Sequence, residues 1–383
     1  MKPNPTKSKM DQRFLDAVLR LARKHQGLTG TNPSVACILV NDLGHGPVVV
    51  GSGVTALGGR PHAEPPAIDE AGKHAKGATA YVTLEPCAHH GKTPPCAQTL
   101  IDAGIARIVT AIADPDERVN GKGHQMMADA GIEICVMDGG ENAKRVMAGY
   151  LAARSEKRPF VTLKLAISSA GIIGSLDGGN LKISCSASNR QTHLSRARHD
   201  AILVGSGTAL ADNPKLTCRL PGMENRSPLR VVLDMKSRLD ETHHLIAAAA
   251  QCPTLVAGNA DAPTSWLAML RANGAQFLAC EAHEGKIALP ELLDDLYARG
   301  IQSVMVEGGA QLAASFLDEG LVDEIILHVG GEPELPEDSS KAVTAPFTLE
   351  RLPQGFDLCQ TLKFGVDQSL RLRRKETKCS PAL

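Results

Sequence analysis

Four residues in the first hundred positions of the chain have the types and order of a zinc site. His62 and Glu64 form the pattern H-x-E in "PHAE", and Cys87 and Cys96 each follow a proline. Zinc binds imidazole and thiolate ligands in a tetrahedron, and a catalytic zinc keeps one position open for water. We therefore predict that His62, Cys87 and Cys96 bind Zn2+ and leave the fourth position open.

Glu64 is predicted to be the catalytic residue of this site rather than a ligand. A carboxylate beside a metal-activated water can take its proton and pass it to a leaving amine. H-x-E followed by P-C-x-x-C is the pattern of zinc nucleobase deaminases. Here the segment "AHHGKTPP" separates the two cysteines, so their spacing is longer than in that pattern. The predicted chemistry is hydrolytic deamination.

A structural zinc site is the alternative interpretation of the same residues. Such a site would need a fourth protein ligand, which His89 or His90 could supply. Taken singly, an H-x-E pattern is most often part of a surface helix, and a Pro-Cys pair means little. A structural site would leave Glu64 without a role, which favours the catalytic interpretation.

Helix starts are predicted to position the proposed ligands. Pro86 and Pro95 directly precede the two cysteines, and proline is favoured where helices begin. The helix dipole at such a position favours thiolate over thiol. His62 is likewise expected at the start of a helix, so that His62 and Glu64 can face one cavity.

The first half of the chain is predicted to form a three-layer α/β domain, because helical and strand patterns alternate along it. The first ten residues are polar and are expected to be disordered. The expected helices cover residues 10–25, 63–75, 96–104, 123–131 and 141–154. The expected strands cover residues 34–40, 46–54, 78–84, 106–112 and 132–137.

A second α/β pattern follows a polar stretch before a proline at 154–160. We therefore predict two domains, residues 11–154 and 159–375. The second has expected helices at 187–199, 289–300 and 310–320. Its expected strands cover 160–168, 200–205, 229–234, 253–258, 275–280, 303–309 and 322–330. A surface loop is predicted at 331–346 and a hairpin at 356–376.

The second half contains weaker chemical signals. "VMVEGGAQLAASFL" is typical of a strand, a glycine turn and a helix, an arrangement whose backbone amides can bind phosphate. After the strand at 200–205 we expect a loop that carries Thr208, Asp212, Asn213 and Arg219. Alone, a Gly-Gly pair or an Asp-Asn-Pro sequence indicates only a turn.

Composition excludes several classes of function. The net charge of −1 and the 3% aromatic content argue against nucleic acid as the main partner. The N-terminus has no apolar signal region, and no apolar run is long enough to span a bilayer. Ten cysteines are scattered without the dense spacing of a secreted disulfide scaffold. These features predict a cytoplasmic enzyme with reduced thiols and no membrane partner.

Longer motifs resemble one family. "TNPSVACILV", "PHAE", "TLEPCAHHGKTPPC" and "DPDERVNGKG" resemble the deaminase half of the bifunctional riboflavin-biosynthesis deaminase–reductases, the RibD family. "LKLAIS", "HLSRARHDAILVGSGTALADNPKLTCR" and "VEGG" resemble its reductase half. The resemblance covers about residues 12–375. It implies a cytidine-deaminase-like domain followed by a dihydrofolate-reductase-like domain.

The resemblance also implies two reactions, two cofactors and a small-molecule substrate. The deaminase uses Zn2+ on a phosphoribosylated diaminopyrimidinone, and the reductase uses NADPH to convert the ribosyl chain to ribityl. A homo-oligomer, dimer or tetramer, is expected. The substrate-binding residues implied for the deaminase are Asn32, His89, Lys92 and Asn120, with Gly121 beside the last.

Residues of the reductase are implied in the same way. An arginine pair suits a phosphate because each guanidinium binds in a bidentate manner. The substrate side would comprise Arg196, Leu216, Arg219 and Glu307. The cofactor side would comprise Ala166, Thr208, Asp212, Gly308, Gly309, Ala310 and Gln311.

Departures from the family pattern leave alternatives open. Ala170 stands where an aspartate is expected, Lys182 where tryptophan is common, and Cys185 where glycine is common. A monofunctional zinc deaminase with a structural reductase-like domain is therefore the main alternative. A nucleic-acid deaminase is opposed by the charge, and a non-catalytic zinc- or NADPH-binding protein is the remaining class. In the deaminase half, Ala36, Pro65 and Pro66 depart from the family without removing a catalytic atom.

Overall fold

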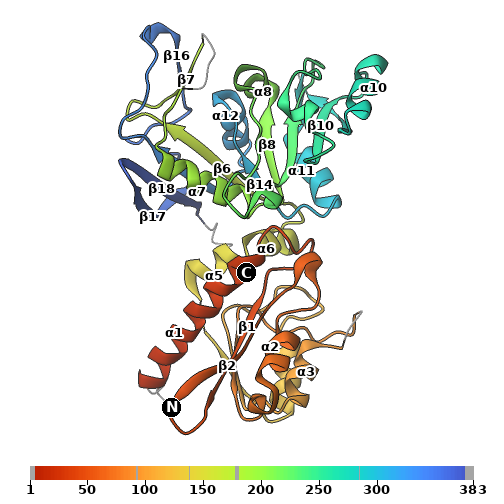
Figure 1. The fold of residues 1–383 in the computed structure, drawn as a ribbon, viewed down its shortest axis with the longest axis vertical. Coiled ribbons are helices and arrows are strands. Elements are labelled where there is room, and N and C mark those ends of the chain that lie inside the picture. The colour runs from red at the N-terminus through yellow and green to blue at the C-terminus, as the bar shows by residue number, and fades with distance from the viewer. Residues whose placement is uncertain (1–4, 92–93, 138, 177–180, 284, 376–383) are drawn as a thin grey trace, which may run out of the picture. The chain divides into compact units, whose positions relative to one another are not determined.

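The computed structural model describes residues 5–91, 94–137, 139–176, 181–283 and 285–375. The chain divides into two compact units, Met1–Lys157 and Arg158–Leu383. Each unit has its own sheet (Figure 1). Each also has its own hydrophobic core. None of the helices in these described ranges combines the length and the apolar character that a membrane crossing requires.

The first unit alternates helices and strands in the predicted order. Its strands are β1 (Ala36–Asp42), β2 (Pro47–Val54), β3 (Thr79–Val82), β4 (Arg107–Thr110) and β5 (Glu133–Val136). Its α-helices are α1 (Pro5–Ala22), α2 (Glu64–Ala71), α3 (Cys96–Asp102), α4 (Lys122–Asp129), α5 (Gly140–Val146) and α6 (Ala148–Ser155). Its 3-10 turns are η1 (Arg23–His25), η2 (Leu57–Gly59) and η3 (Gly72–Ala75).

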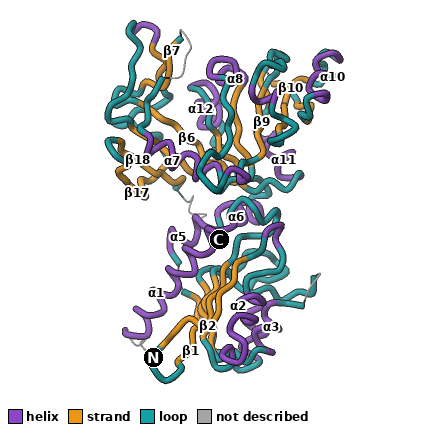
Figure 2. The backbone as a smooth tube through the Cα atoms, viewed as in Figure 1, coloured by secondary structure: helices purple, strands orange, loops and turns teal. Residues whose placement is uncertain are grey.

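The sheet of the first unit is mixed and covered on both faces, so the predicted three layers are confirmed. Its strand order is β2-β1-β3-β4-β5, with β1 antiparallel to β2 and β3 and the remaining pairs parallel. Alternate residues of β1 point to opposite faces. Ile38 shares a buried cluster with Leu15 of α1, and Leu39 shares another with Ala67 of α2 and Leu100 of α3. Figure 2 shows α1 on one side of the strands and α2 and α3 on the other.

Helix α2 lies unusually close to β2 because two glycines remove the side chains between them. A Cβ on Gly51 would lie 2.1 Å from the carbonyl oxygen of Ala67, and one on Gly53 would lie 2.0 Å from that of Ala63. No heavier residue fits at that distance without moving the helix. The two glycines therefore fix the position of the helix that carries Glu64.

The second unit is also a layered α/β structure. Its α-helices are α7 (Ser186–Arg196), α8 (Ser206–Asp212), α9 (His244–Ala247), α10 (Thr264–Ala272), α11 (Leu289–Ala298) and α12 (Ala310–Asp318). Its strands up to β13 are β6 (Phe160–Ile167), β7 (Ile172–Ser175), β8 (Ala201–Gly205), β9 (Leu229–Leu233), β10 (Thr254–Asn259), β11 (Gln276–Cys280), β12 (Ala282–His283) and β13 (Lys286–Ile287). The last are β14 (Ser303–Val306), β15 (Glu324–Val329), β16 (Ala342–Thr344), β17 (Phe356–Phe364) and β18 (Asp367–Arg374), and the 3-10 turns are η4 (Glu224–Arg226) and η5 (Ser339–Lys341).

The large sheet of this unit has the order β11-β10-β9-β8-β14-β6-β15-β18-β17. Its pairs are parallel from β11 to β15, whereas β18 is antiparallel to both of its neighbours. One face packs on Leu293 of α11 and Phe316 of α12, and the other on Ala209 of α8 and Leu270 of α10. The predicted C-terminal hairpin is β17–β18.

Several sequence predictions were wrong in detail. Helix α1 already begins at Pro5, within the ten residues expected to be disordered. The helix expected at 141–154 is two helices, which meet at Met147, where φ is −99° and ψ is 5°. The loop expected after the strand at 200–205 begins with helix α8, whose C-cap residue Asn213 has the left-handed conformation with φ 39°. Strand β16 lies within the loop expected at 331–346, and helices α9 and α10 were not predicted.

Candidate functional site

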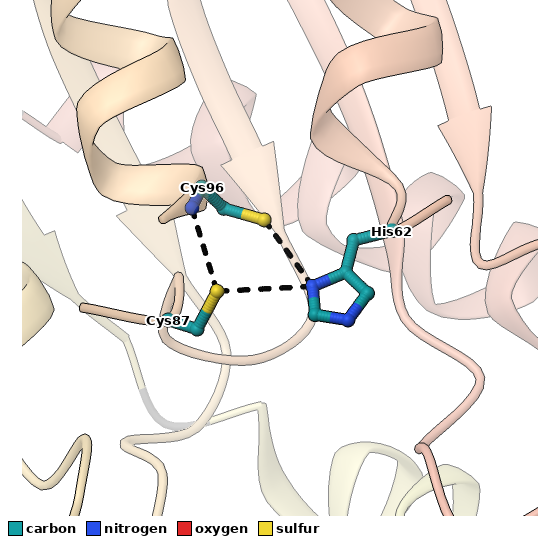
Figure 3. A group of neighbouring side chains, drawn as sticks. All are labelled: His62, Cys87 and Cys96. Atoms are coloured by element: carbon teal, nitrogen blue, oxygen red, sulfur yellow. Dashed lines mark hydrogen bonds between the residues drawn. The ribbon is translucent and has the colours of Figure 1, made fainter. Parts of the chain in front are cut away.

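His62, Cys87 and Cys96 converge in the first unit (Figure 3). Their ligand atoms all lie within 4.8 Å of one another. His62 Nδ1 lies 3.3 Å from Cys96 Sγ and 3.8 Å from Cys87 Sγ. Nitrogen and sulfur ligands of one tetrahedral zinc are separated by about 3.5 Å, given the usual metal–ligand bond lengths. The three side chains therefore fit a single zinc ion.

Local structure explains how the three side chains meet. His62 lies immediately before α2, and Cys96 is the first residue of α3 with Pro95 as its N-cap, as predicted. Cys87 lies in an irregular loop, so the helix start predicted for it was wrong. The first turn of α3 nevertheless supports it, because the Cys96 N–H donates to Cys87 Sγ at 3.4 Å and the Ala97 N–H donates to the Cys87 carbonyl at 3.2 Å.

The surroundings of Cys87 favour its thiolate form. A hydrogen bond from Cys96, together with one from His62, lowers the pKa of the Cys87 thiol to about 4 despite its partial burial. The same contact to Cys87 raises the pKa of His62. The thiolate is the form of cysteine that binds a divalent metal.

The ligand set is that of a catalytic rather than a structural zinc. Among the described residues, the metal-binding group consists of these three side chains, without His89 or His90. Structural zinc sites usually have four protein ligands, whereas catalytic sites have three and keep a position for water or substrate. The alternative of a fourth histidine ligand is therefore not supported.

Glu64 is the first residue of α2 and is 3% exposed. Burial is the main cause that raises the pKa of its carboxyl, and the charge of Cys87 adds to it. A carboxylate with a raised pKa is a better proton acceptor at neutral pH than an exposed one. Its contact with Cys96 places it beside the three ligands, as a proton-transfer residue requires.

A cavity beside these residues brings together most of the deaminase positions expected from the sequence. Its lining includes Asn32, His62, Glu64, Cys87 and His89. The Nδ1 atom of His89 is buried and has no hydrogen-bond partner among the described residues. A buried polar atom of this kind is costly unless a ligand or water satisfies it.

Cys96, Asn120 and Lys92 are expected deaminase residues that do not appear among the described lining residues of this cavity. Asn120 is exposed, its N–H donates to the Asp116 carbonyl at 3.0 Å, and it does not appear among the described lining residues. Lys92 lies outside the described residues. Sequence reasoning also missed part of the lining, namely Arg60, Asp114, Asp116, Arg118, Tyr150 and Arg154.

Glu85, in the motif "TLEPC", is a buried carboxylate that sequence reasoning did not single out. It is 3% exposed and accepts hydrogen bonds from the backbone N–H groups of Asp114, Gly121, Gly123 and His124 at 3.0–3.3 Å. Through the N–H groups of Asp114 and Gly121, Glu85 therefore holds both ends of the loop 114–121 beside the cavity. A glutamate directly before Pro-Cys was the signal that could have identified it.

The second unit contains a cavity of about 620 Å3, large enough for a sizeable ligand. It brings together most of the residues expected for the reductase. The predicted lining residues are Ala166, Arg196, Thr208, Asp212, Leu216, Arg219, Glu307, Gly308 and Gly309. Ala310 and Gln311 begin α12 instead and do not appear among the described lining residues.

Arg196 and Glu307 form a bidentate ion pair on the wall of this cavity. Arg196 Nε and Nη2 each donate to a carboxylate oxygen of Glu307 at 2.7 Å. Burial alone would raise the pKa of Glu307, but Arg196 and then Lys164 outweigh it and hold that pKa at about 2. Lys164, which sequence reasoning missed, lines the same cavity, and burial lowers its pKa.

The expected cofactor side combines a glycine turn with helix α8. The Gly309 N–H donates to Thr208 Oγ1 at 3.0 Å, which ties the start of α12 to α8. A helix N-terminus preceded by glycines suits a phosphate group. Asp212 ends α8, and burial raises the pKa of its carboxyl. The cavity volume and this turn together fit a dinucleotide cofactor.

The departures from the family pattern lie in different places. Lys182 lines the reductase cavity, and its ammonium lies 3.5 Å from Glu334 Oε1. Cys185 is the N-cap of α7, and its N–H donates to Asp367 at 2.8 Å. Ala170 is exposed and does not appear among the described lining residues. Only Lys182 of the three can therefore contact a ligand in this cavity.

Comparison with known families agrees with this division of the chain. The model of the cytidine and deoxycytidylate deaminase zinc-binding region matches residues 8–112. The model of the RibD C-terminal domain matches residues 159–331. The His62–Cys87–Cys96 cluster falls within the first match, and most of the reductase cavity residues fall within the second.

Whole-chain relatives extend the similarity. Riboflavin biosynthesis protein RibD of Haemophilus influenzae is 37% identical over 347 residues, covering 88% of this chain and 89% of the relative. RibD of Escherichia coli is 34% identical over 376 residues, covering 94% of this chain and 99% of the relative.

Solved structures agree at the level of the whole chain. RibD of Acinetobacter baumannii superposes with a TM-score of 0.81 at 34% identity, covering 96% of this chain and 99% of that chain. A diaminohydroxyphosphoribosylaminopyrimidine deaminase/5-amino-6-(5-phosphoribosylamino)uracil reductase from Thermotoga maritima gives a TM-score of 0.81 at 29% identity with the same coverage. The chain therefore belongs to the family of the riboflavin biosynthesis protein RibD, with a zinc-binding deaminase region followed by a RibD C-terminal domain.

Proposed function

We propose that the chain is a bifunctional enzyme of riboflavin biosynthesis. Its first unit deaminates 2,5-diamino-6-(5-phosphoribosylamino)pyrimidin-4(3H)-one, and its second unit reduces the ribosyl chain of the product to ribityl with NADPH. The observation that carries the proposal is the convergence of His62, Cys87 and Cys96 beside the buried carboxyl of Glu64. The relative from Thermotoga maritima carries both activities in its name.

In the deaminase, His62, Cys87 and Cys96 would hold zinc, and Glu64 would move the proton. Bound zinc supplies a Lewis acid that makes water nucleophilic near neutral pH. Glu64 accepts a proton from the attacking water and delivers it to the departing amine, so that ammonia leaves and a carbonyl remains. Asn32 and His89 line the cavity where they can hydrogen-bond the pyrimidine and its ribosyl chain. Lys92 and Asn120 are further proposed substrate contacts.

In the reductase, the residues of the large cavity position substrate and cofactor. NADPH supplies a hydride to the carbonyl carbon of the ring-opened ribosyl chain. Glu307 orients Arg196 through two hydrogen bonds, and burial together with the positive charge of Arg196 lowers the pKa of the neighbouring Arg219. Two like charges held close together are suited to an anion.

The cofactor side of that cavity is assigned from the glycine turn. The start of α12 and Thr208 border the cavity at Gly309, whose amide is fixed by the Thr208 hydroxyl. We propose that Ala166, Thr208, Asp212 and Gly308 to Gln311 contact NADPH.

A monofunctional deaminase is the second candidate, because Lys182 and Ala170 replace residues common in the family. Against it stands the chemistry of the cavity, which contains the Arg196–Glu307 ion pair and the glycine turn expected for a reductase. We therefore propose that the second unit is active, that residues 11–154 and 159–375 are the two functional domains, and that the enzyme is a cytoplasmic homo-oligomer without a nucleic-acid partner.

A two-stage assay tests the proposed function. Purified enzyme is given the diaminopyrimidinone phosphate, and ammonia release is measured before NADPH is added. The proposal predicts one ammonia per substrate and then one NADPH oxidised per deaminated product. Ammonia release without NADPH oxidation would establish the monofunctional alternative. The absence of both reactions would refute the proposal.

A further inference from the structure

The loop 114–121 forms one wall of the deaminase cavity and has a defined shape. The Asp116 N–H donates to Asp114 Oδ1 at 2.9 Å, and the Arg118 N–H donates to Asp116 Oδ1 at 3.0 Å. These two consecutive side-chain turns are closed at the loop ends by Glu85, which accepts from the N–H groups of Asp114 and Gly121. A loop held in this way presents its side chains in fixed directions.

Asp116 holds two arginines at the cavity wall. Arg118 Nε donates to Asp116 Oδ1 at 2.9 Å and Arg118 Nη2 to Oδ2 at 2.6 Å. Arg154 of α6 approaches the same carboxylate, with Nε 3.6 Å from Oδ2. The Asp116 side chain is only 9% exposed, whereas those of Arg118 and Arg154 are 59% and 32% exposed. The carboxylate is therefore enclosed and the guanidinium groups face the open part of the wall.

Tyr150 orients the second guanidinium. Arg154 lies over the Tyr150 ring at 5.2 Å from its centroid, and the Tyr150 hydroxyl donates to Asp114 Oδ1 at 2.9 Å. A ring under the guanidinium adds an attractive contact and limits its motion. All of these side chains line the cavity that contains His62 and Glu64.

The group holds two guanidinium groups and two carboxylates, and both guanidinium groups contact the carboxylate of Asp116. Arg118 and Arg154 share the single carboxylate of Asp116, and the bonds of Arg118 to it use Nε and Nη2, which leaves Nη1 for another acceptor. The acceptors of Asp114 are occupied by Tyr150 and by the Asp116 amide. Pre-oriented guanidinium groups recognise the oxygens of a phosphate well, because little side-chain freedom is lost on binding.

We propose that Arg118 and Arg154, oriented by Asp116 and Tyr150, form an anion subsite of the deaminase that binds the phosphate of the phosphoribosyl substrate. This inference rests on the proposed function and adds to it. It assigns specificity for phosphorylated over unphosphorylated substrate to the wall formed by loop 114–121 and α6. The pyrimidine occupies the part of the cavity at His62 and Glu64.

The test compares two substrates in ammonia release by the full-length zinc enzyme. They are the diaminopyrimidinone phosphate and its dephosphorylated nucleoside. Arg118→Gln and Arg154→Gln are each expected to raise KM for the phosphorylated substrate about tenfold, the usual effect of losing one charged hydrogen bond. Neither variant changes kcat/KM for the nucleoside. Arg13→Gln, at an exposed position on α1, is the matched control and changes neither value.

Further measurements separate this subsite from a structural role. The variants Arg118→Lys and Arg154→Lys keep the positive charge but lose the paired N–H donors of the guanidinium group. They are expected to give intermediate KM values. Zinc content and unfolding temperature equal to those of wild type are expected for all of these variants. An unchanged KM for the phosphate, or equal losses on both substrates, would overturn the inference. Absence of ammonia release in wild type would instead refute the proposed function.

Discussion

At the scale of single residues, we propose that Glu64 carries the proton transfer in the deaminase. Its carboxyl is buried and touches the ligand cluster. Glu64→Gln keeps the shape but cannot accept a proton. It should lower kcat for ammonia release by roughly 10²- to 10⁴-fold, the usual contribution of a positioned acid–base group. Metal analysis should show zinc at the wild-type level, and a variant that retains full activity would contradict the assignment.

Glu307 is the second residue with a predicted measurable effect. Glu307→Gln leaves Arg196 buried without its counter-charge, so the free energy of unfolding should fall by about 3 kcal/mol at pH 7. The pKa of Glu307 is about 2 in the folded chain, below its ordinary value of 4.5. The stabilisation by its charge is therefore present above pH 4.5 and is lost as the pH falls toward 2.

Denaturant titrations of wild type and Glu307→Gln at several pH values check this prediction. The difference between the two proteins should be largest near neutral pH and should shrink below pH 4.5. A difference that is constant with pH would show that the Glu307 charge does not stabilise the fold.

Functional residues could be predicted from the sequence where the combination of their side-chain types is rare. His62, Cys87 and Cys96 could be predicted because few functions other than metal binding bring imidazole and two thiols together in that order. Lys164 could not, because a lysine within a strand looks like an ordinary surface residue, and the signal for Glu85 was limited to its position directly before Pro-Cys. Only the folded chain shows that Glu85 accepts four backbone hydrogen bonds and that Lys164 borders a cavity.

At the scale of elements, the close contact of α2 with β2 positions the deaminase site. Gly53→Ala would place a Cβ 2.0 Å from the Ala63 carbonyl, so α2 must move away from the sheet. We expect a loss of roughly 1–3 kcal/mol in stability, the usual cost of overpacking, and weaker zinc retention, because His62 and Glu64 move with the helix. Gly207→Ala is the control, since a Cβ there meets nothing within 4 Å.

Thermal unfolding and dialysis against a zinc buffer measure these two effects. Equal zinc retention by Gly53→Ala and wild type would show that the helix position does not control the metal site.

Helices and strands were predicted well where their hydrophobic pattern extended over many residues, and poorly where they were short. The strands of both large sheets were expected from runs of Val, Ile, Leu and Ala. Helix α8 was missed because it is only seven residues long and contains Gly207, Thr208 and Asp212, which are residue types that are unfavourable within helices. Its burial of Ala209 against the sheet, a tertiary contact, stabilises it as a helix.

At the scale of the whole molecule, the proposed deaminase and reductase cavities are lined by residues of different units. Removal of zinc with a chelator should abolish ammonia release from the diaminopyrimidinone phosphate. NADPH oxidation with the deaminated intermediate should remain near its original rate, because none of the described residues that line the reductase cavity belongs to the metal cluster. Restored ammonia release after zinc is added back is the control. A parallel loss of both activities would contradict separate sites.

Family membership and the order of the two catalytic regions could be inferred from long motifs spread over most of the chain. The number of subunits could not, because association depends on surfaces whose composition is not distinctive in one sequence. Light scattering of the purified chain would test the expected dimer or tetramer.

Zinc content and ammonia release, measured together for wild type and Cys87→Ser, test the central claim most directly. The account predicts one zinc per wild-type chain and steady ammonia release from the diaminopyrimidinone phosphate, with both strongly reduced in Cys87→Ser. A wild-type chain that releases ammonia without zinc, or a Cys87→Ser chain that keeps both properties, would contradict it.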